Sequence, residues 1–93
     1  MRDVVLLTES GKTVGFSIQP SFLKDLNIEH GDNVEIEIFK EYQGKESVTF
    51  TRPLVNIGGS KGVTIRYWLV KDLKLKVGET LSVDIRNPKE KNQ

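Results

Sequence analysis

The chain has 93 residues, of which 37% are hydrophobic and 29% are charged, and its formal net charge is +1. This length allows one compact domain, or two small units that share a core. No apolar run approaches the roughly 20 residues that a membrane helix needs. The N-terminal segment lacks the features of a signal peptide, and the absence of cysteine excludes disulfides and cysteine-based zinc sites. We therefore expect a soluble, cytoplasmic protein.

The small net charge hides a difference between the two halves of the chain. Residues 1–47 carry five Lys or Arg against nine Asp or Glu, a net charge of −4. Residues 48–93 carry nine against four, a net charge of +5. A basic second half favours contacts with nucleic acid, and the alternative is a drift of surface charge. The Lys- and Glu-rich composition without cysteine is also typical of a thermophile.

Two strands and their turn are predicted at the start of the chain. Residues 4–8 (VVLLT) are aliphatic and β-branched, which predicts a short, largely buried strand. Residues 13–19 alternate between apolar and polar side chains, which predicts a half-buried strand. Gly11 is suited to the turn between them, so we expect the two strands to form a hairpin.

A short helix and a further strand are predicted next. Pro20 fits the first turn of a helix, where its missing N–H costs nothing, and Asn27 suits a helix end. The helix therefore has about two turns. Residues 33–39 alternate strictly, which predicts a strand with its Val and Ile side chains inward. Its two glutamates, Glu35 and Glu37, are expected to face water.

The second half of the chain repeats the first at an offset of 47 residues. The segment 15–38 aligns without a gap with the segment 62–85, and the two copies share seven identical residues. Most other positions are similar in type, and Pro53 in the second copy argues for an edge strand or a bulge. The identical pairs are Gly15/Gly62, Ile18/Ile65, Lys24/Lys71, Asp25/Asp72, Leu26/Leu73, Gly31/Gly78 and Ile38/Ile85.

One unit used twice predicts two halves that fold against each other. We therefore expect a single domain rather than two independent ones, because half of this chain has too little core to fold alone. The expected organisation is one domain at 1–88, with repeats at 3–40 and 47–88, a linker at 41–46 and a disordered tail at 89–93.

The repeated unit resembles the AbrB/MazE family of DNA-binding domains (the SpoVT-AbrB domain). In the first copy the resemblance rests on Ile18, Phe22, Leu26-Asn27-Ile28, Gly31-Asp32 and the strand residues Val34, Ile36 and Ile38. In that family two short chains usually exchange hairpins and close one small β-barrel. The resemblance therefore implies a mainly β fold with two short helices, a single-chain pseudo-dimeric swapped-hairpin β-barrel. It also implies a transcriptional regulator that binds double-stranded DNA.

The sequence departs from the family pattern at positions that matter for DNA contacts. The family usually opens the motif with Gly-Arg, and here Val14-Gly15 and Lys61-Gly62 stand in that place. The arginine that commonly meets DNA is thus missing from both copies. Gln19 and Arg66 stand where the family usually has a proline before the helix.

Basic residues on the strand-to-strand tips and on the helices are candidates for contacts with DNA phosphates. Each such contact would add a salt-dependent contribution to binding. The alternative for each of them is an ordinary solvated face. The candidates are Lys12, Lys24, Arg52, Lys61, Arg66, Lys71, Lys74 and Lys76.

A protein-interaction module, antitoxin-like or an adaptor, is the second hypothesis. If the helices bury Phe22 and Leu26, and Leu69 and Leu73, then some apolar residues lie off the core face. An apolar patch of this kind would mark a surface for a protein partner or for self-association. The alternative is a rotated or wider-faced helix that places some of them in the core. The candidates are Leu23, Tyr67, Trp68 and Val70.

Motifs for catalysis, cofactors or metals are not visible in the sequence. His30 is the only histidine and is expected to be a solvent-exposed turn residue. The segment 58–62 contains Gly-Ser-Lys but lacks the glycine spacing of a phosphate-binding loop. We therefore expect no enzymatic activity, no cofactor, no metal and no small-molecule substrate.

Overall fold

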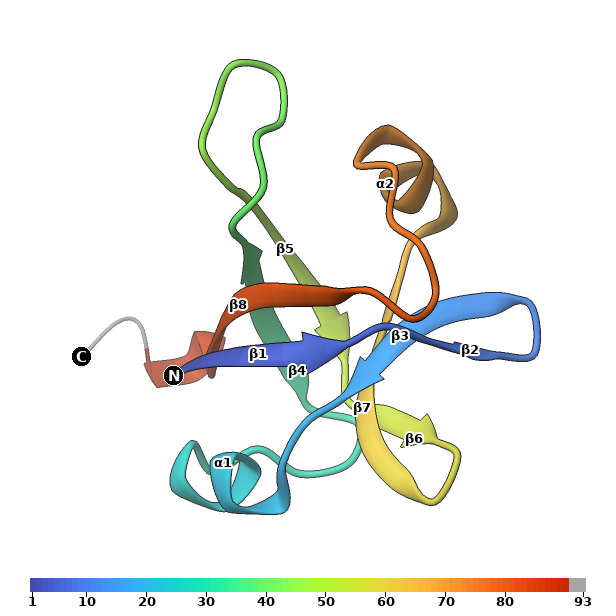
Figure 1. Cartoon of the computed structure of the whole chain (residues 1–93). Coiled ribbons are helices and arrows are strands. Elements are labelled where there is room, and N and C mark those ends of the chain that lie inside the picture. Colours follow the sequence, from blue (N-terminus) through green and yellow to red (C-terminus); the bar gives the residue numbers. More distant parts are fainter. Residues whose placement is uncertain (91–93) are drawn as a thin grey trace.

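The computed structural model of the protein describes residues 1–90, and these residues are mainly β, as the sequence predicts. They form two four-stranded antiparallel sheets and two helices of six residues each (Figure 1). Among the described residues, no helix has the length and apolar character needed to cross a membrane. The elements are β1 (Arg2–Leu6), β2 (Thr8–Ser10), β3 (Thr13–Ser17), α1 (Pro20–Asp25), β4 (Asn33–Ile38), β5 (Val48–Pro53), β6 (Val55–Ile57), β7 (Ser60–Ile65), α2 (Tyr67–Asp72), β8 (Thr80–Arg86) and the 3-10 turn η1 (Pro88–Glu90).

The 47-residue repeat is visible in the order of the strands. The first sheet has the order β1–β8–β4–β5, and the second has the order β2–β3–β7–β6. Each repeat therefore contributes two strands to each sheet. Only the hairpins β2–β3 and β6–β7 pair strands of the same repeat. The pairs β1–β8, β4–β8, β4–β5 and β3–β7 all join one repeat to the other.

The strands do not close into the expected barrel, because the two sheets stay separate within the described residues. The chain bends at Leu7 and at its equivalent Leu54, which lie between β1 and β2 and between β5 and β6. The expected strand at 4–8 is thus divided, and its first part pairs with β8 instead of β3. Both leucines are fully buried, so each bend places an apolar side chain between the sheets. Only β2 forms the predicted hairpin with β3.

The core lies between the two sheets and is built from matched residues of the two repeats. The positions between the sheets are apolar and buried in both copies, whereas the helix positions 22, 23 and 26 are fully buried in only one of the two copies. Pro53 ends β5, an edge strand, where a missing N–H is tolerated, as predicted. The matched buried pairs include Leu7/Leu54, Phe16/Val63, Ile18/Ile65, Ile36/Val83 and Ile38/Ile85.

Strands β3 and β7 approach each other so closely that Gly15 and Gly62 leave no room for a side chain. A Cβ atom on Gly15 would lie 2.3 Å from the carbonyl oxygen of Val63. A Cβ atom on Gly62 would lie 2.1 Å from the carbonyl oxygen of Phe16. Glycine within a strand commonly marks such an approach of two backbones. This packing accounts for glycine at the same position of both repeats.

Both helices end in the same way, close to the predicted positions. Asn27 and Lys74 adopt positive φ angles of 57° and 55°. The next residue in each case, Ile28 or Leu75, donates its N–H to a carbonyl five residues earlier. This is the Schellman arrangement, which satisfies carbonyl groups at a helix end and turns the chain.

The linker and residues 88–90 form turns. Within the linker, Tyr42 and Lys45 exchange two backbone hydrogen bonds. Residues 89 and 90, expected to belong to the tail, lie in η1. The side chain of Asn87 holds this turn, because its Oδ1 accepts the N–H of Lys89 and its Nδ2 donates to the carbonyl of Leu26. The rest of the expected tail, 91–93, lies outside the described residues.

Candidate nucleic-acid interface

The eight basic candidates do not form a single surface. Lys24 lies on α1, whereas Lys71, Lys74 and Lys76 lie on α2 or in the segment that follows it. The two helices lie on opposite sides of the molecule (Figure 1). A ligand that contacts α2 is therefore not expected to contact Lys24 as well.

Two of the candidates are held by hydrogen bonds within the protein. Arg52 on β5 donates from Nε to the carbonyl of Thr64, at 3.1 Å, and from Nη2 to the hydroxyl of Thr64, at 2.8 Å. It therefore ties the first sheet to the second. Lys61 donates from Nζ to Oδ1 of Asn56, at 2.6 Å, and lies 3.1 Å from Nδ1 of His30. Both side chains are half-buried. A phosphate would have to compete with these internal hydrogen bonds for the guanidinium of Arg52 and the amine of Lys61.

The other basic candidates of the second repeat gather around α2. Arg66 occupies the N-cap, Lys71 the last turn, and Lys74 and Lys76 the segment after the helix. All four are exposed, and within the described residues none forms an ion pair with an acidic side chain. Lys12, in the turn between β2 and β3, lies at the same end of the second sheet as Arg66, because Val14 pairs with Ile65.

The equivalent segment of the first repeat has the opposite charge. Residues 66–76 carry four basic residues and one acidic residue, so their net charge is 4 − 1 = +3. Residues 19–29 carry one basic and two acidic residues, a net charge of 1 − 2 = −1. Asp72, the one acidic residue of this segment, accepts a hydrogen bond from the hydroxyl of Tyr42 at 2.8 Å. The positive charge is thus a property of α2 and not of the fold.

Two exposed aromatic side chains lie among these cations. Tyr67 and Trp68 form the first turn of α2 and are 74% and 55% exposed. The Nζ of Lys71, one turn later, lies 5.7 Å from the centroid of the Tyr67 ring. The equivalent residues of the first repeat are Pro20 and Ser21, so the aromatic pair occurs in one repeat alone.

Leu23, predicted to lie off the core face of α1, is instead buried, with 8% of its surface exposed. The alternative of a rotated helix holds here, since Phe22 and Leu26 are only partly buried. Val70 also packs partly against the core. Tyr67 and Trp68 are therefore the exposed members of the predicted interface.

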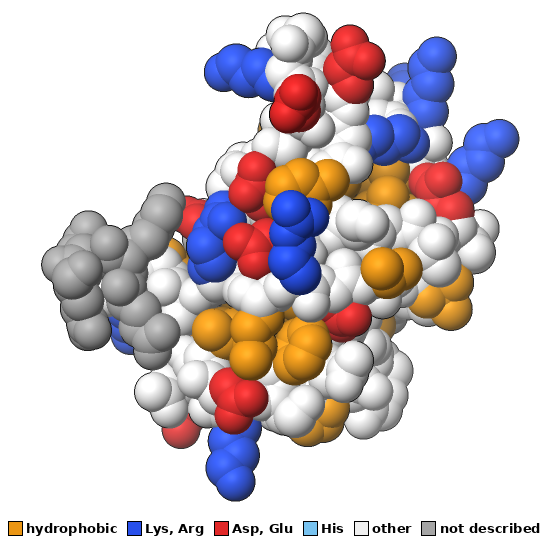
Figure 2. Space-filling view, turned by 60° about the vertical axis from the view of Figure 1, so that its left-hand side comes forward, with side chains coloured by type: hydrophobic (Ala, Val, Ile, Leu, Met, Phe, Trp, Pro, Cys, Tyr) orange, Lys and Arg blue, Asp and Glu red, His pale blue; other side chains and the backbone are white. Residues whose placement is uncertain are grey.

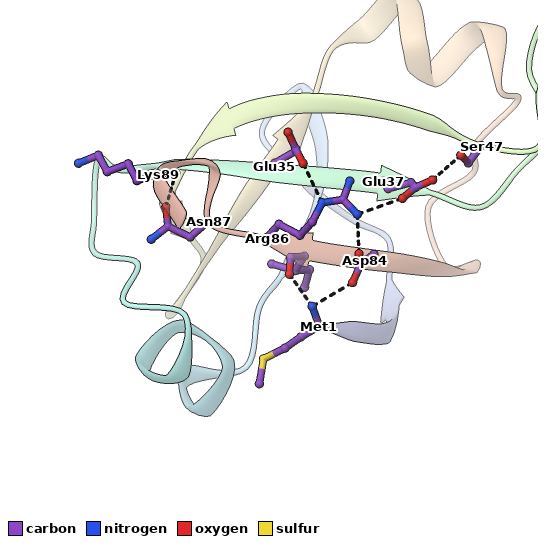
Figure 3. A network of polar contacts seen from close by, with 9 residues as sticks. Met1, Glu35, Glu37, Ser47, Asp84, Arg86, Asn87 and Lys89 are labelled. Atoms are coloured by element: carbon purple, nitrogen blue, oxygen red, sulfur yellow. Dashed lines mark hydrogen bonds and ion pairs between the residues drawn. The ribbon is translucent and has the colours of Figure 1, made fainter. Parts of the chain in front are cut away.

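An ionic cluster on the outer face of the first sheet was not predicted from the sequence (Figure 3). Arg86 on β8 donates from Nε to Glu35, at 2.7 Å, and from Nη1 to Glu37 and Asp84, at 3.1 and 2.5 Å. The N-terminal amine of Met1 lies 2.9 Å from the carboxylate of Asp84. Figure 2 shows acidic and basic side chains gathered at the centre of one face, with hydrophobic side chains beside them. Because Arg86 brings β4 and β8 together, the cluster joins the two repeats.

Glu35, expected to face water, is only 7% exposed. The antiparallel register places it directly opposite Arg86, whose side chain covers it. Alternation along one strand identifies the face on which a residue lies, but not the residue across the ladder. The sequence offers only the position of Arg86, directly after the repeated segment 62–85, and the pairing of the two repeats is needed to find its partner Glu35.

The contacts of this cluster change the acidity of its members. The hydroxyl of Ser47 and then the guanidinium of Arg86 lower the pKa of Glu37 below its ordinary value of 4.5. Burial raises the pKa of Asp84, but hydrogen bonds and charges of the N-terminal amine and Arg86 outweigh it and leave the pKa below 3.8. The hydrogen bond to Glu35 is the main reason why the pKa of Arg86 is raised. Three carboxylates surround one guanidinium and the N-terminal amine, so most of the charge is compensated within the cluster, which is suited to stability rather than to binding.

The chain shows no match to known proteins. No protein-family model matches it, and neither a curated protein nor a solved structure matches it. In residues 1–90, no group of His, Cys, Asp and Glu side chains is arranged to hold a metal ion. Evidence for the function of the surface around α2 therefore comes from its geometry and charge alone.

Proposed function

We propose that the protein binds nucleic acid through the α2 surface, defined as Arg66, Tyr67, Trp68, Lys71, Lys74 and Lys76, and acts as a DNA-binding regulator of the AbrB type. The observation that carries the proposal is the net charge of +3 on residues 66–76, against −1 on the equivalent segment of the same fold. Exposed cations without acidic partners release counterions when they meet phosphates, which favours binding at low salt.

The order of the strands supports an AbrB-type architecture within this proposal. The outer strand of the first repeat, β1, lies on β8 of the second, and β5 of the second lies on β4 of the first. This reciprocal pairing is what a single-chain, swapped-hairpin pseudo-dimer requires. The two helices then lie at equivalent places, and only one of them carries the basic surface.

The test is the binding of a random-sequence 20-base-pair DNA duplex across a salt series. In the variant with Arg66, Lys71 and Lys74 each replaced by Gln, we expect weaker binding. The slope of log K against log[salt] should also become smaller by up to about 3 units, since each phosphate contact contributes about 0.9. Lys24→Gln is the matched control, because Lys24 is the equivalent of Lys71 on α1. It should leave the binding and the slope unchanged.

Two results would contradict the proposal. One is an absence of binding by the unaltered protein even at low salt. The other is a triple variant that binds the duplex with the affinity and the salt dependence of the unaltered protein, which would place the contacts elsewhere.

A protein partner is the second candidate function, and the exposure of Tyr67 and Trp68 favours it. Exposed Tyr, Trp and Arg side chains are enriched among the residues that dominate binding energy at protein interfaces. This function predicts a stable complex with an acidic protein that is lost in Trp68→Ser. It also predicts little affinity for DNA at physiological salt. Retention of the complex by Trp68→Ser would exclude this surface.

A further inference from the structure

The two aromatic rings of α2 point away from the core because of how the helix packs. Leu69 and Leu73 are buried, and Val70 is packed partly against the core. These contacts fix the rotation of the six-residue helix and leave Tyr67 and Trp68 in solvent. Large aromatic side chains that remain exposed beside polar residues commonly mark a binding surface.

The first repeat shows that the fold does not require aromatic residues at these positions. Pro20 and Ser21 begin α1 at the equivalent places, and α1 has the same length and the same type of C-terminal turn as α2. Helix formation and packing therefore do not explain the aromatic pair. The pair coincides with the positive charge of the same helix, which the first repeat also lacks.

Aromatic rings among unpaired cations are suited to nucleic acid whose bases are unstacked. Proteins that bind single strands combine cations that follow the phosphates with aromatic side chains on which bases stack. In a duplex the base faces are covered by their neighbours, so exposed rings would find only groove edges and backbone. Lys71 lies beside the ring of Tyr67, and Arg66 directly precedes the two aromatic residues in the chain.

We infer that the α2 surface binds single-stranded nucleic acid, with bases stacked on Tyr67 and Trp68 and phosphates held by Arg66, Lys71, Lys74 and Lys76. The inference rests on the proposed function and narrows its ligand. An acidic protein would satisfy the same cations, but it needs a planar side chain placed opposite the aromatic pair, whereas every nucleotide of a single strand carries both a phosphate and a base that can stack. The charge and the aromatic surface together therefore favour the single strand.

The test uses the full chain and its only tryptophan, Trp68, as a fluorescent reporter. A 15-residue oligothymidylate, the matching 15-base-pair dT·dA duplex and a 15-residue oligouridylate are titrated at fixed salt. We expect quenching of the Trp68 emission by the single strands and an affinity at least tenfold higher than for the duplex. Comparison of the two single strands shows whether DNA or RNA is preferred.

Two substitutions separate stacking from charge. Trp68→Ser introduces the residue of the first repeat, and labelled oligothymidylate should then bind about 10- to 100-fold more weakly. Its salt dependence and its binding to the duplex should change little. Trp68→Phe, which keeps a ring, should retain most of the affinity for the single strand. The circular dichroism and thermal unfolding of both variants should match those of the unaltered protein, because the side chain is exposed.

Different results would overturn the inference and the proposed function. If the duplex binds as tightly as the single strand, and Trp68→Ser changes neither, then stacking is excluded while electrostatic DNA binding stands. If neither ligand binds at low salt, both ideas are wrong. A loss of binding in Trp68→Ser that Trp68→Phe does not restore would also contradict stacking.

Discussion

At the scale of single residues, the short distance between the backbones of β3 and β7 leaves no room for a side chain at Gly15 or Gly62. We predict that Gly62→Ala destabilises the protein by roughly 1–3 kcal/mol, because the new methyl group would meet the backbone of Phe16 and force the strands apart. Gly59→Ala is the control, since a Cβ atom there would have no atom within 4 Å. Urea unfolding of both variants measures the difference, and equal midpoints would contradict this account of the strand crossing.

The same scale shows what the sequence reveals and what it does not. The repetition of Gly15 at Gly62 indicates that both positions need glycine. The reason, the close approach of the two backbones, is visible only when the strands are paired. Alternation correctly places Val34, Ile36 and Ile38 in the core. It is wrong about Glu35, because burial of that carboxylate depends on Arg86, a residue 51 positions away.

At the scale of elements, the ionic cluster connects the central strands β4 and β8 and makes stability depend on pH. Glu37 and Asp84 have lower pKa values in the folded chain than their ordinary values of 4.5 and 3.8. Above these ordinary values both groups are ionised in both states, and their stabilisation is complete. As the pH falls through the lowered pKa values, both groups become protonated. The free energy of unfolding therefore decreases as the pH falls below about 5.

We predict that Arg86→Met lowers the free energy of unfolding by about 2 kcal/mol at pH 7, because hydrogen bonds to charged groups are lost. Its urea midpoint should also fall less steeply than that of the unaltered protein between pH 5 and pH 3. Arg66→Met is the control, since Arg66 is exposed at the start of α2 and forms no ion pair with an acidic side chain of the described residues. Parallel pH profiles for Arg86→Met and the unaltered protein would show that the cluster does not cause this dependence.

The elements also show why a local pattern predicts some boundaries and misses others. The ends of both helices follow from short-range chemistry, Pro20 at the start of α1 and a residue with positive φ after each helix. The bend at Leu7 has no comparable signal in the sequence, since no proline or glycine marks it. Val5 and Leu7 are buried, whereas Val4 and Leu6 are 64% and 54% exposed, so the expectation of a largely buried strand at 4–8 is wrong for one of its faces. The continuous apolar run indicates neither this alternation nor the bend between the two sheets.

At the scale of the whole molecule, the two repeats agree inside and differ outside. The matched core pairs are buried at equivalent places in both repeats, and this part of the structure can be predicted from the repeat alone. The surface has no such constraint, which is why α1 and α2 differ by four units of charge over equivalent segments. Comparison of the two repeats therefore separates the residues that the fold requires from those that it does not require. The features found in one copy only, the basic charge and the aromatic pair of α2, are the ones that point to function.

The strand order makes a further prediction, that neither repeat folds without the other. In a fragment of residues 1–46, β1 and β4 would lose every strand that they pair with, and only the short hairpin β2–β3 would remain. An isolated hairpin is marginally stable at best in water. We therefore expect fragments 1–46 and 47–93 to be unfolded separately by circular dichroism. An equimolar mixture should regain the β spectrum in a concentration-dependent manner, because association of two chains costs several kcal/mol of translational and rotational freedom.

Insertion of four Gly or Ser residues between Gln43 and Gly44 keeps the chain continuous and is the control for cutting the linker. This exposed turn should tolerate the insertion with a loss of less than about 1 kcal/mol, since the closure entropy of a loop grows only slowly with its length. Sedimentation of the separate fragments distinguishes an unfolded monomer from a fragment that pairs with itself through the same strands. A monomeric half that unfolds cooperatively in urea would contradict the shared core. If instead the fragments fold only together, the linker contributes by making an intermolecular association intramolecular.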